Sequence, residues 1–235
     1  MKILVIDDEK PTLSMFKLFL AAYGYEVFTA EDGETGLRRF REICPEIVFT
    51  DIRMPGIDGL EVLRRIRKLS PPTQVIIITG HGDMEKAVEA LDLDASDFIN
   101  KPVERQALNS ALARAEKRAG MAVIPEFTCN HILNQGRKEI HIKGKLTADH
   151  RQRMADLICS EGLQTSSQAH FLFDDSFSID RGGIKLLMEI LIKIRQRRIQ
   201  VIMTGLSYNY VRFFQMAGMD KLAQFQTASS DKGEG

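Results

Sequence analysis

The chain has 235 residues, of which 44% are hydrophobic and 27% charged, as in ordinary globular proteins, and its length predicts two domains. Its 32 basic and 32 acidic residues cancel, which speaks against a dedicated nucleic-acid binder, because such proteins usually carry a basic excess. No apolar stretch is long enough to span a membrane, and the first residues, MKILVIDDEK, meet acidic residues too early for a signal peptide. We therefore expect a cytoplasmic protein.

Short apolar runs alternate with helix-length amphipathic segments over the first 120 residues. Runs that are apolar on both faces are typical of strands buried in a parallel sheet, and helical periodicity separates them. The predicted strands are 3–6, 26–29, 46–51, 74–79 and 97–99, and the clearest helices are 58–68 and 103–118. Five βα units in succession predict a doubly wound α/β domain.

Charged side chains stand at the ends of three of these predicted strands. Asp7 and Asp8 follow the first strand, Asp51 ends the third, and Lys101 follows the fifth. Because ligands bind beyond the carboxyl ends of strands in such sheets, we expect these groups to meet there. Crowded carboxylates require a cation, and an all-oxygen ligand set suits Mg²⁺. Lys101 could hold a phosphoryl oxygen, and Asp51 could act as a nucleophile that forms an aspartyl-phosphate.

Four motifs in this order resemble the response-regulator receiver family over residues 1–119, a flavodoxin-like (βα)5 domain. They are Asp7-Asp8, the segment DIRMPGIDG at 51–59, TGHGD at 79–83, and Lys101-Pro102. The resemblance implies that a sensor histidine kinase phosphorylates Asp51. It also implies that Asp8, Asp51 and the Arg53 backbone carbonyl bind Mg²⁺, and that Asp7 acts through a water molecule.

The same resemblance assigns a switch to the first domain. Thr79 corresponds to the family's switch hydroxyl, which together with Lys101 serves the reaction at Asp51, and Phe98 stands at the position of the switch aromatic. Plain core packing is the alternative for Phe98, and a strand-end turn is the alternative for Thr79. Asp94 occupies a position where the family often has glycine, and aspartate tolerates a left-handed backbone better than most residues.

A break at 120–125, marked by glycine and proline, predicts a short hinge. Beyond it, a second domain is predicted over 126–228, followed by a flexible polar tail over 229–235. Its predicted strands are 127–133, 139–144, 171–173 and 200–204, and its predicted helices are 148–160, 184–194 and 208–218.

The order of these elements resembles the STAS family of anti-sigma-factor antagonists and implies a smaller α/β domain with a mixed sheet. The matching segments are IKGKL, FLFDD, SIDRGGI, VIMTG and FFQMAGM. The resemblance implies an interaction surface made by Ser178, Asp180, Arg181, Gly182 and Gly183. Arg181 stands where the family's regulatory serine is expected, so we interpret control by serine phosphorylation as lost and control as passed to Asp51.

The resulting hypothesis is a phosphorylation-gated interaction protein whose only catalysis is its own aspartyl phosphorylation and dephosphorylation. The partner implied by resemblance is an anti-sigma factor or another protein with a serine-kinase fold. The alternatives are a constitutive scaffold or homodimer and an output domain that binds a ligand or nucleic acid. DNA binding is not expected, because no helix-turn-helix pattern follows residue 121. We interpret the basic cluster of Lys193, Arg195, Arg197 and Arg198 as a solvated helix end that complements the helix dipole, with nucleic-acid contact as the alternative.

Overall fold

The computed structural model describes residues 1–80, 83–121, 125–134, 137–159 and 167–226. They fall into two compact units, Met1–Ala122 and Val123–Gly235, which are described separately. The predicted tail, 229–235, and residues 122–124 of the predicted hinge lie outside the described residues. Within the described part of the chain, no helix is long and apolar enough to cross a membrane.

The first unit is built on a five-stranded sheet in the order β2-β1-β3-β4-β5, and every neighbouring pair is parallel. The strands are β1 (Lys2–Ile6), β2 (Glu26–Ala30), β3 (Ile47–Asp51), β4 (Gln74–Thr79) and β5 (Asp97–Asn100). All residues of β3 and β4 are buried, which explains their continuous apolar runs. From β1 the chain adds β2 on one side of the sheet and then β3 on the other side. The winding direction therefore reverses between β1 and β3, and the carboxyl ends of these two strands flank this switch point.

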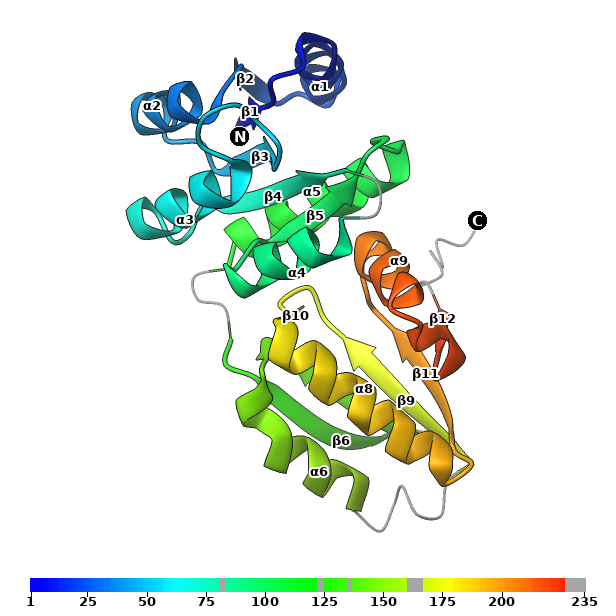
Figure 1. The fold of residues 1–235 in the computed structure, drawn as a ribbon. Helices are drawn as coiled ribbons and strands as arrows, with labels where there is room; N and C mark the ends of the chain where they lie inside the picture. The colour runs from blue at the N-terminus through cyan, green and yellow to red at the C-terminus, as the bar shows by residue number, and fades with distance from the viewer. Residues whose placement is uncertain (81–82, 122–124, 135–136, 160–166, 227–235) are drawn as a thin grey trace. The chain divides into compact units, whose positions relative to one another are not determined.

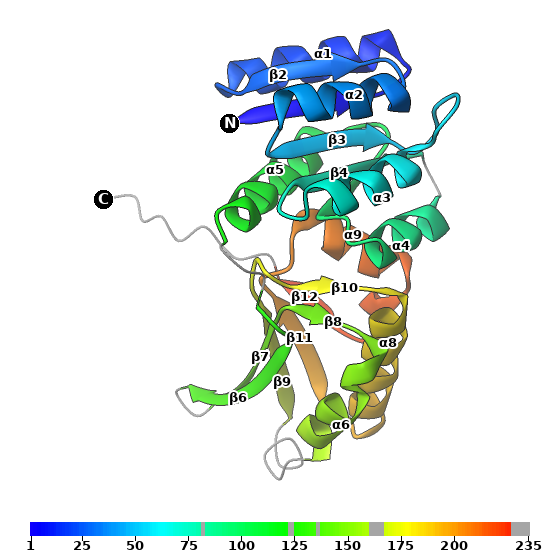
Figure 2. The same cartoon turned by 90° about the vertical axis from the view of Figure 1, so that its left-hand side faces the viewer.

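Helices cover both faces of this sheet, as Figures 1 and 2 show. Helices α1 and α5 lie on one face, and α2, α3 and α4 lie on the other. Their bounds are α1 (Lys10–Ala22), α2 (Gly33–Ile43), α3 (Gly59–Leu69), α4 (Met84–Asp92) and α5 (Arg105–Ala119). This arrangement confirms the flavodoxin-like fold predicted from the sequence. Asp94, after α4, has a φ of 64°, the left-handed conformation that its position indicated.

The second unit contains a five-stranded mixed sheet in the order β12-β11-β9-β7-β6. Only the β6–β7 hairpin is antiparallel. The strands are β6 (Thr128–Asn134), β7 (Arg137–Lys143), β9 (Gln168–Phe173), β11 (Gln200–Thr204) and β12 (Gln224–Gln226). Two short strands, β8 (Lys145–Leu146) and β10 (Ser178–Ile179), form a separate parallel pair that the sequence pattern did not predict.

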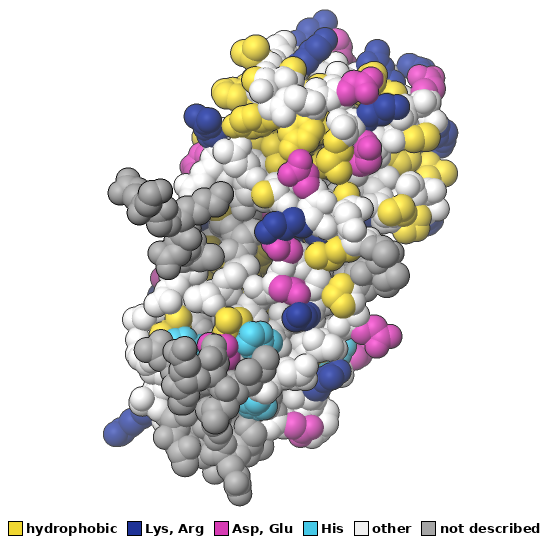
Figure 3. All heavy atoms as spheres, turned by 180° about the vertical axis from the view of Figure 1, so that it is seen from behind, with side chains coloured by type: hydrophobic (Ala, Val, Ile, Leu, Met, Phe, Trp, Pro, Cys, Tyr) yellow, Lys and Arg dark blue, Asp and Glu magenta, His cyan; other side chains and the backbone are white. Residues whose placement is uncertain are grey.

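Helices α6 (Arg151–Cys159) and α8 (Arg181–Gln196) lie on one face of this mixed sheet (Figure 2). The predicted helix over 148–160 begins instead with a 3₁₀ turn, Ala148–His150, because Thr147 forms a capping box with His150. The last helix, α9 (Tyr208–Met216), ends before Gly218, whose φ is 80°. Figure 3 shows histidine side chains on the side of the second unit that is turned away from α8.

Candidate functional site

The carboxyl edge of the first sheet gathers three carboxylates and one ammonium group. Asp7 follows β1, Asp51 ends β3, and one oxygen from each of Asp7, Asp8 and Asp51 lies within 4.8 Å of the others. Asp7 and Asp51 are buried, whereas Asp8 is exposed. The strand ends therefore bring these three predicted residues together, as the switch-point argument required.

Lys101 is the positive centre of this site. Its Nζ atom lies 2.7 Å from Asp51 Oδ2, 3.1 Å from Asp7 Oδ2 and 3.3 Å from Glu9 Oε2. Burial lowers the pKa of Lys101, but the hydrogen bond and charge of Asp51 and the charge of Asp7 outweigh it, so the pKa is raised. Lys101 is therefore a permanent cation that links two strand ends.

The pKa of the Asp7 carboxyl group is raised above its usual value. Burial raises its pKa, although a hydrogen bond from the Glu9 amide and the charge of Lys101 oppose this shift. Its Oδ1 atom accepts the Glu9 N–H at 2.8 Å, while its buried Oδ2 atom forms an ion pair with Lys101 Nζ at 3.1 Å. A buried carboxylate oxygen beside a cation is also a suitable partner for a metal-bound water molecule.

The local sequence after β3 explains how Asp51 is held. Gly59 begins α3, and a Cβ atom at this position would lie 2.0 Å from the Asp51 carbonyl oxygen, so only glycine fits. Asp58 caps the helix by accepting the Glu61 N–H at 2.8 Å. Arg53, whose backbone carbonyl is a predicted metal ligand, donates its N–H to Asp51 Oδ1 over 3.4 Å.

The predicted switch residues lie on the two neighbouring strands. Thr79 ends β4, and its hydroxyl donates to Asn100 Oδ1 at 2.7 Å. Phe98 is buried on β5, where Ile77 of β4 is its partner in the register. The hydroxyl of the predicted residue Thr79 thus bonds to Asn100, which was not predicted as a site residue.

Three site residues were missed from the sequence: Glu9, Asp83 and Asn100. Glu9 provides a third carboxylate for Lys101, and hydrogen bonds from Thr12 and Lys101 lower its pKa. Asp83 accepts a hydrogen bond from the Arg53 guanidinium at 2.6 Å. The adjacency of Glu9 to Asp7-Asp8 was a usable signal, whereas the contact of Asn100 depends on rotamers that no sequence pattern specifies.

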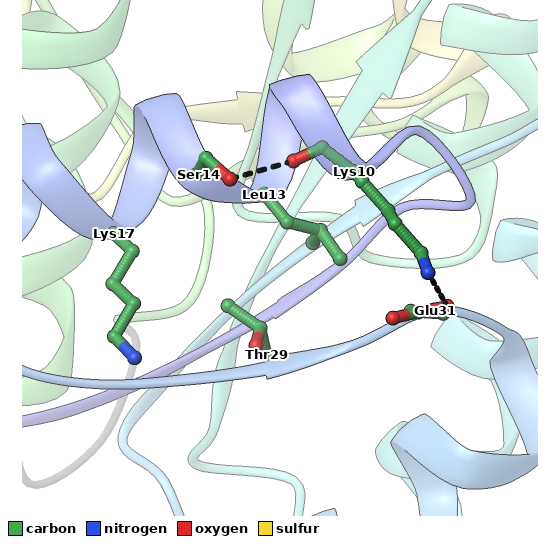
Figure 4. Close-up of a pocket in the computed structure, with 6 residues that line it drawn as sticks. All are labelled: Lys10, Leu13, Ser14, Lys17, Thr29 and Glu31. Carbon is green, nitrogen blue, oxygen red and sulfur yellow. Dashed lines mark hydrogen bonds and ion pairs between the residues drawn. The ribbon is translucent and has the colours of Figure 1, made fainter.

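The donor set fits a hard divalent cation such as Mg²⁺. All candidate ligand atoms are oxygens, three carboxylates are close together, and two of them, Asp7 and Asp51, are buried. A different hollow lies between α1 and β2, with a volume of about 260 Å³ and an ion pair between Lys10 and Glu31 (Figure 4). None of its lining residues belongs to the cluster of Asp7, Asp8 and Asp51, so the two features are separate.

The predicted interaction residues of the second unit meet at the start of α8. Ser178 lies on β10, and Asp180 caps the helix by accepting the Gly183 N–H at 2.7 Å. A Cβ atom at Gly183 would lie 2.1 Å from the Leu146 carbonyl oxygen, and one at Gly182 would lie 2.9 Å from Ala148 Cβ. Arg181 is the first residue of the helix. The close contacts at the next two positions restrict them to glycine.

Comparisons with known proteins identify the first unit. Residues 3–113 match the profile of the response regulator receiver domain. The chain is 39% identical over 114 residues to regulatory protein AtoC of Escherichia coli, covering 48% of this chain and 25% of AtoC. It is 35% identical over 130 residues to transcriptional regulatory protein FixJ of Bradyrhizobium diazoefficiens, covering 55% of this chain and 63% of FixJ.

A crystal structure of a response regulator receiver domain protein from Clostridium thermocellum is 44% identical, with a TM-score of 0.48, and the match covers 50% of this chain and 94% of that one. The profile match shows that residues 3–113 belong to the response regulator receiver domain family, a family of signalling domains. The chain spans less than two thirds of the length of AtoC and of FixJ. The profile match ends at residue 113 and therefore describes the first unit only.

Proposed function

We propose that the chain is a two-component response regulator that accepts a phosphoryl group on Asp51 and thereby controls the interactions of its second unit. The observation that carries this proposal is the position of Asp51, whose carboxylate lies 2.7 Å from Lys101 Nζ and beside Asp7 and Asp8. The receiver family supports this class of reaction, and the geometry around Asp51 supports this residue as the acceptor.

In the proposed reaction, an Asp51 oxygen attacks the phosphorus of a phosphohistidine. The phosphorus–nitrogen bond breaks and a phosphorus–oxygen bond forms, so the electron pair returns to the imidazole of the donor. Asp8, Asp51 and the Arg53 carbonyl would hold Mg²⁺, and Asp7 would contact it through water. Bound Mg²⁺ supplies charge neutralisation for the phosphoryl oxygens. Lys101, held as a cation by Asp51 and Asp7, is placed to stabilise another of these oxygens.

Exposed apolar side chains on α1 support a protein phosphodonor, namely a sensor histidine kinase. Near its C-terminal end α1 exposes Leu18, which is 73% accessible, and Phe19, which is 41% accessible, and its C-cap residue Tyr23 is also 41% accessible. Figure 3 shows exposed hydrophobic side chains on the first unit. Apolar side chains of this size on one helix are typical of a protein-binding surface.

For the second unit, we propose a STAS-like output domain that binds a protein partner. Its mixed sheet, the glycine-restricted start of α8 and the Asp180 cap support this proposal. Arg181 and Gly182 replace the two serines of the STAS motif, and any side chain at 182 would have to displace Ala148. Control by serine phosphorylation is therefore absent from this position, and Asp51 is the proposed control site.

A DNA-binding output is the second candidate, because relatives of the first unit include proteins named as transcriptional regulators. These names give no support to the expectation, based on net charge, that the chain does not bind DNA. The receiver profile covers residues 3–113 only, however, and the mixed sheet of the second unit is not a helix-turn-helix. A constitutive scaffold or dimer is a third candidate.

A single set of binding measurements separates these candidates. Affinity for a purified anti-sigma factor of serine-kinase fold and for mixed-sequence duplex DNA is measured with wild type and Asp51→Asn, with and without acetyl phosphate and Mg²⁺. We expect protein binding that changes at least tenfold on phosphorylation of the wild type only. Salt-sensitive DNA binding would favour the second candidate. Unchanged affinities with a mass above that of the monomer would favour a scaffold.

A further inference from the structure

Two adjoining pockets lie at the C-terminal end of α8, where this helix meets the start of β11 (Figure 1). Their volumes are about 420 and 290 Å³, close to the range of small-ligand sites. Arg195 and Gln200 line both pockets, Arg198 lines the larger one, and Lys221 lines the smaller one. The two hollows therefore share a wall that carries a guanidinium group.

The charge of these pockets is positive although the whole chain is neutral. Arg195, Arg198 and Lys221 are exposed, and Asp220 is the one acidic residue among the lining residues. Among the residues that the structure describes, none of these three cations forms an ion pair. Three cations facing one carboxylate leave room for an anion with more than one negative charge.

The simpler interpretation is that the arginines serve the helix end by binding its last carbonyl groups. Backbone bonds already do this: the Ile194 carbonyl accepts the N–H groups of Arg197 and Ile199, and the Arg195 carbonyl accepts that of Arg198. These bonds form the usual closure of a helix C-terminus. The guanidinium groups of Arg195 and Arg198 are therefore not required for capping.

The backbone at Arg198 gives an independent indication. Its φ is 61°, in the left-handed region, at the position after a helix where glycine is strongly preferred. The corresponding position after α9 is Gly218, with a φ of 80°. Arginine is less favourable than glycine in this conformation, and such residues concentrate at functional sites. The side chain of Arg198 lines the larger pocket, so this unfavourable backbone conformation coincides with a residue of the candidate site.

We propose that these two pockets bind a small anion that carries two or more phosphate groups, free or as part of a nucleotide. The planar guanidinium group binds phosphate oxygens in pairs, and Arg195 can reach a group in either pocket. Arg198 in the larger pocket and Lys221 in the smaller one would each neutralise one end of the bound anion. A concave site with only three cations suits a small molecule better than the extended backbone of nucleic acid.

The test is a calorimetric titration of the full chain with pyrophosphate at constant ionic strength and without divalent cations, so that the acidic site of the receiver domain does not recruit the probe. We expect saturable binding that Arg195→Gln weakens at least tenfold. The matched control is Lys193→Gln, which removes an exposed charge from the same helix end but lines neither pocket. Its affinity should stay within twofold of wild type. Equal losses in both variants, or no saturable binding, would overturn the proposal.

Arg198→Gly separates binding from stability. Glycine adopts the left-handed conformation without the strain that a Cβ atom causes, so we expect the Tm to rise by about 2–4 °C. Because the guanidinium group is lost, pyrophosphate affinity should fall at least fivefold. A higher Tm with unchanged affinity would contradict a role of Arg198 in binding. Parallel titrations with ATP and adenosine identify the source: tighter binding of ATP than of pyrophosphate indicates a nucleotide, and equal binding indicates the free anion. Binding of duplex DNA without binding of pyrophosphate would overturn the proposal.

Discussion

The hydroxyl of Thr79 donates a 2.7 Å hydrogen bond to Asn100 Oδ1, across the ends of two neighbouring strands. In a receiver domain this hydroxyl is expected to turn toward a phosphoryl group on Asp51. On the proposed switching role of Thr79, the bond to Asn100 would stabilise the unphosphorylated arrangement, and its loss on phosphorylation would be part of the cost of switching. Such a bond contributes about 1 kcal/mol, a factor of about five in a population.

Asn100→Ala should therefore raise the population of the phosphorylated-like conformation about fivefold in the unphosphorylated protein. The measurement is the backbone amide spectrum by NMR, in which β4 and β5 signals should move toward their positions in the phosphorylated wild type. Thr79→Ser is the control, because it keeps the hydroxyl that donates to Asn100 and should give no such shift. Signals of Asn100→Ala that coincide with those of the unphosphorylated wild type would contradict this role.

Lys101→Met should destabilise the receiver domain, because it leaves the Asp7 and Asp51 carboxylates without their cation. We expect a loss of about 2 kcal/mol in the free energy of unfolding, less than for a fully buried pair because Lys101 is 25% exposed. Addition of Mg²⁺ should recover part of it. Lys17→Met, at an exposed lysine of α1, is the control for urea denaturation. Equal stability of both variants would show that Lys101 is not needed to balance these charges.

Asp7→Asn should stabilise the apo protein and weaken Mg²⁺ binding. Burial raises the pKa of Asp7, so the native state binds a proton more readily than the unfolded chain, and stability is lost as pH rises through the interval above 3.8. The variant should lose this pH dependence and show a higher Tm at neutral pH. Its Mg²⁺ affinity, measured by calorimetry, should fall 10- to 100-fold, as for other residues that act through a bound water. A lower Tm together with unchanged Mg²⁺ affinity would contradict this assignment.

Asp180→Ala should reduce the stability of the second unit by about 1 kcal/mol, because Asp180 accepts the Gly183 N–H at the start of α8. Asp149→Ala removes an exposed carboxylate from the neighbouring 3₁₀ turn, which lacks a bond from that side chain, and should have little effect. Chemical denaturation followed by circular dichroism measures both. Asp180→Asn should retain most of the stability, since asparagine is an equally good cap.

The sequence predicted the first unit accurately because buried parallel strands are continuous apolar runs, such as 74–79, and because charged residues follow them at fixed places. The proximity of Asp51 and Lys101 could be predicted because both lie at the carboxyl ends of strands in one parallel sheet. The bond between Thr79 and Asn100 could not, because it depends on side-chain rotamers at the ends of two strands.

Less of the second unit could be predicted. Strands of two or three residues, such as β8 and β12, are too short to show periodicity, and tertiary packing fixes them. The serine motif also misleads here, because the absence of serine at 182 reflects the close approach of Ala148 as well as any change in regulation. The left-handed Arg198 was visible only as part of a basic cluster, since a sequence does not reveal φ.

The central claim is that Asp51 is the phosphoacceptor, and intact mass measurement after incubation with acetyl phosphate and Mg²⁺ tests it most directly. The matched control is Asp32→Asn, an N-cap change in the same unit that conserves capping. The account predicts addition of one phosphoryl group to the wild type and to Asp32→Asn, and none to Asp51→Asn. Phosphorylation of Asp51→Asn to the wild-type extent would contradict the account.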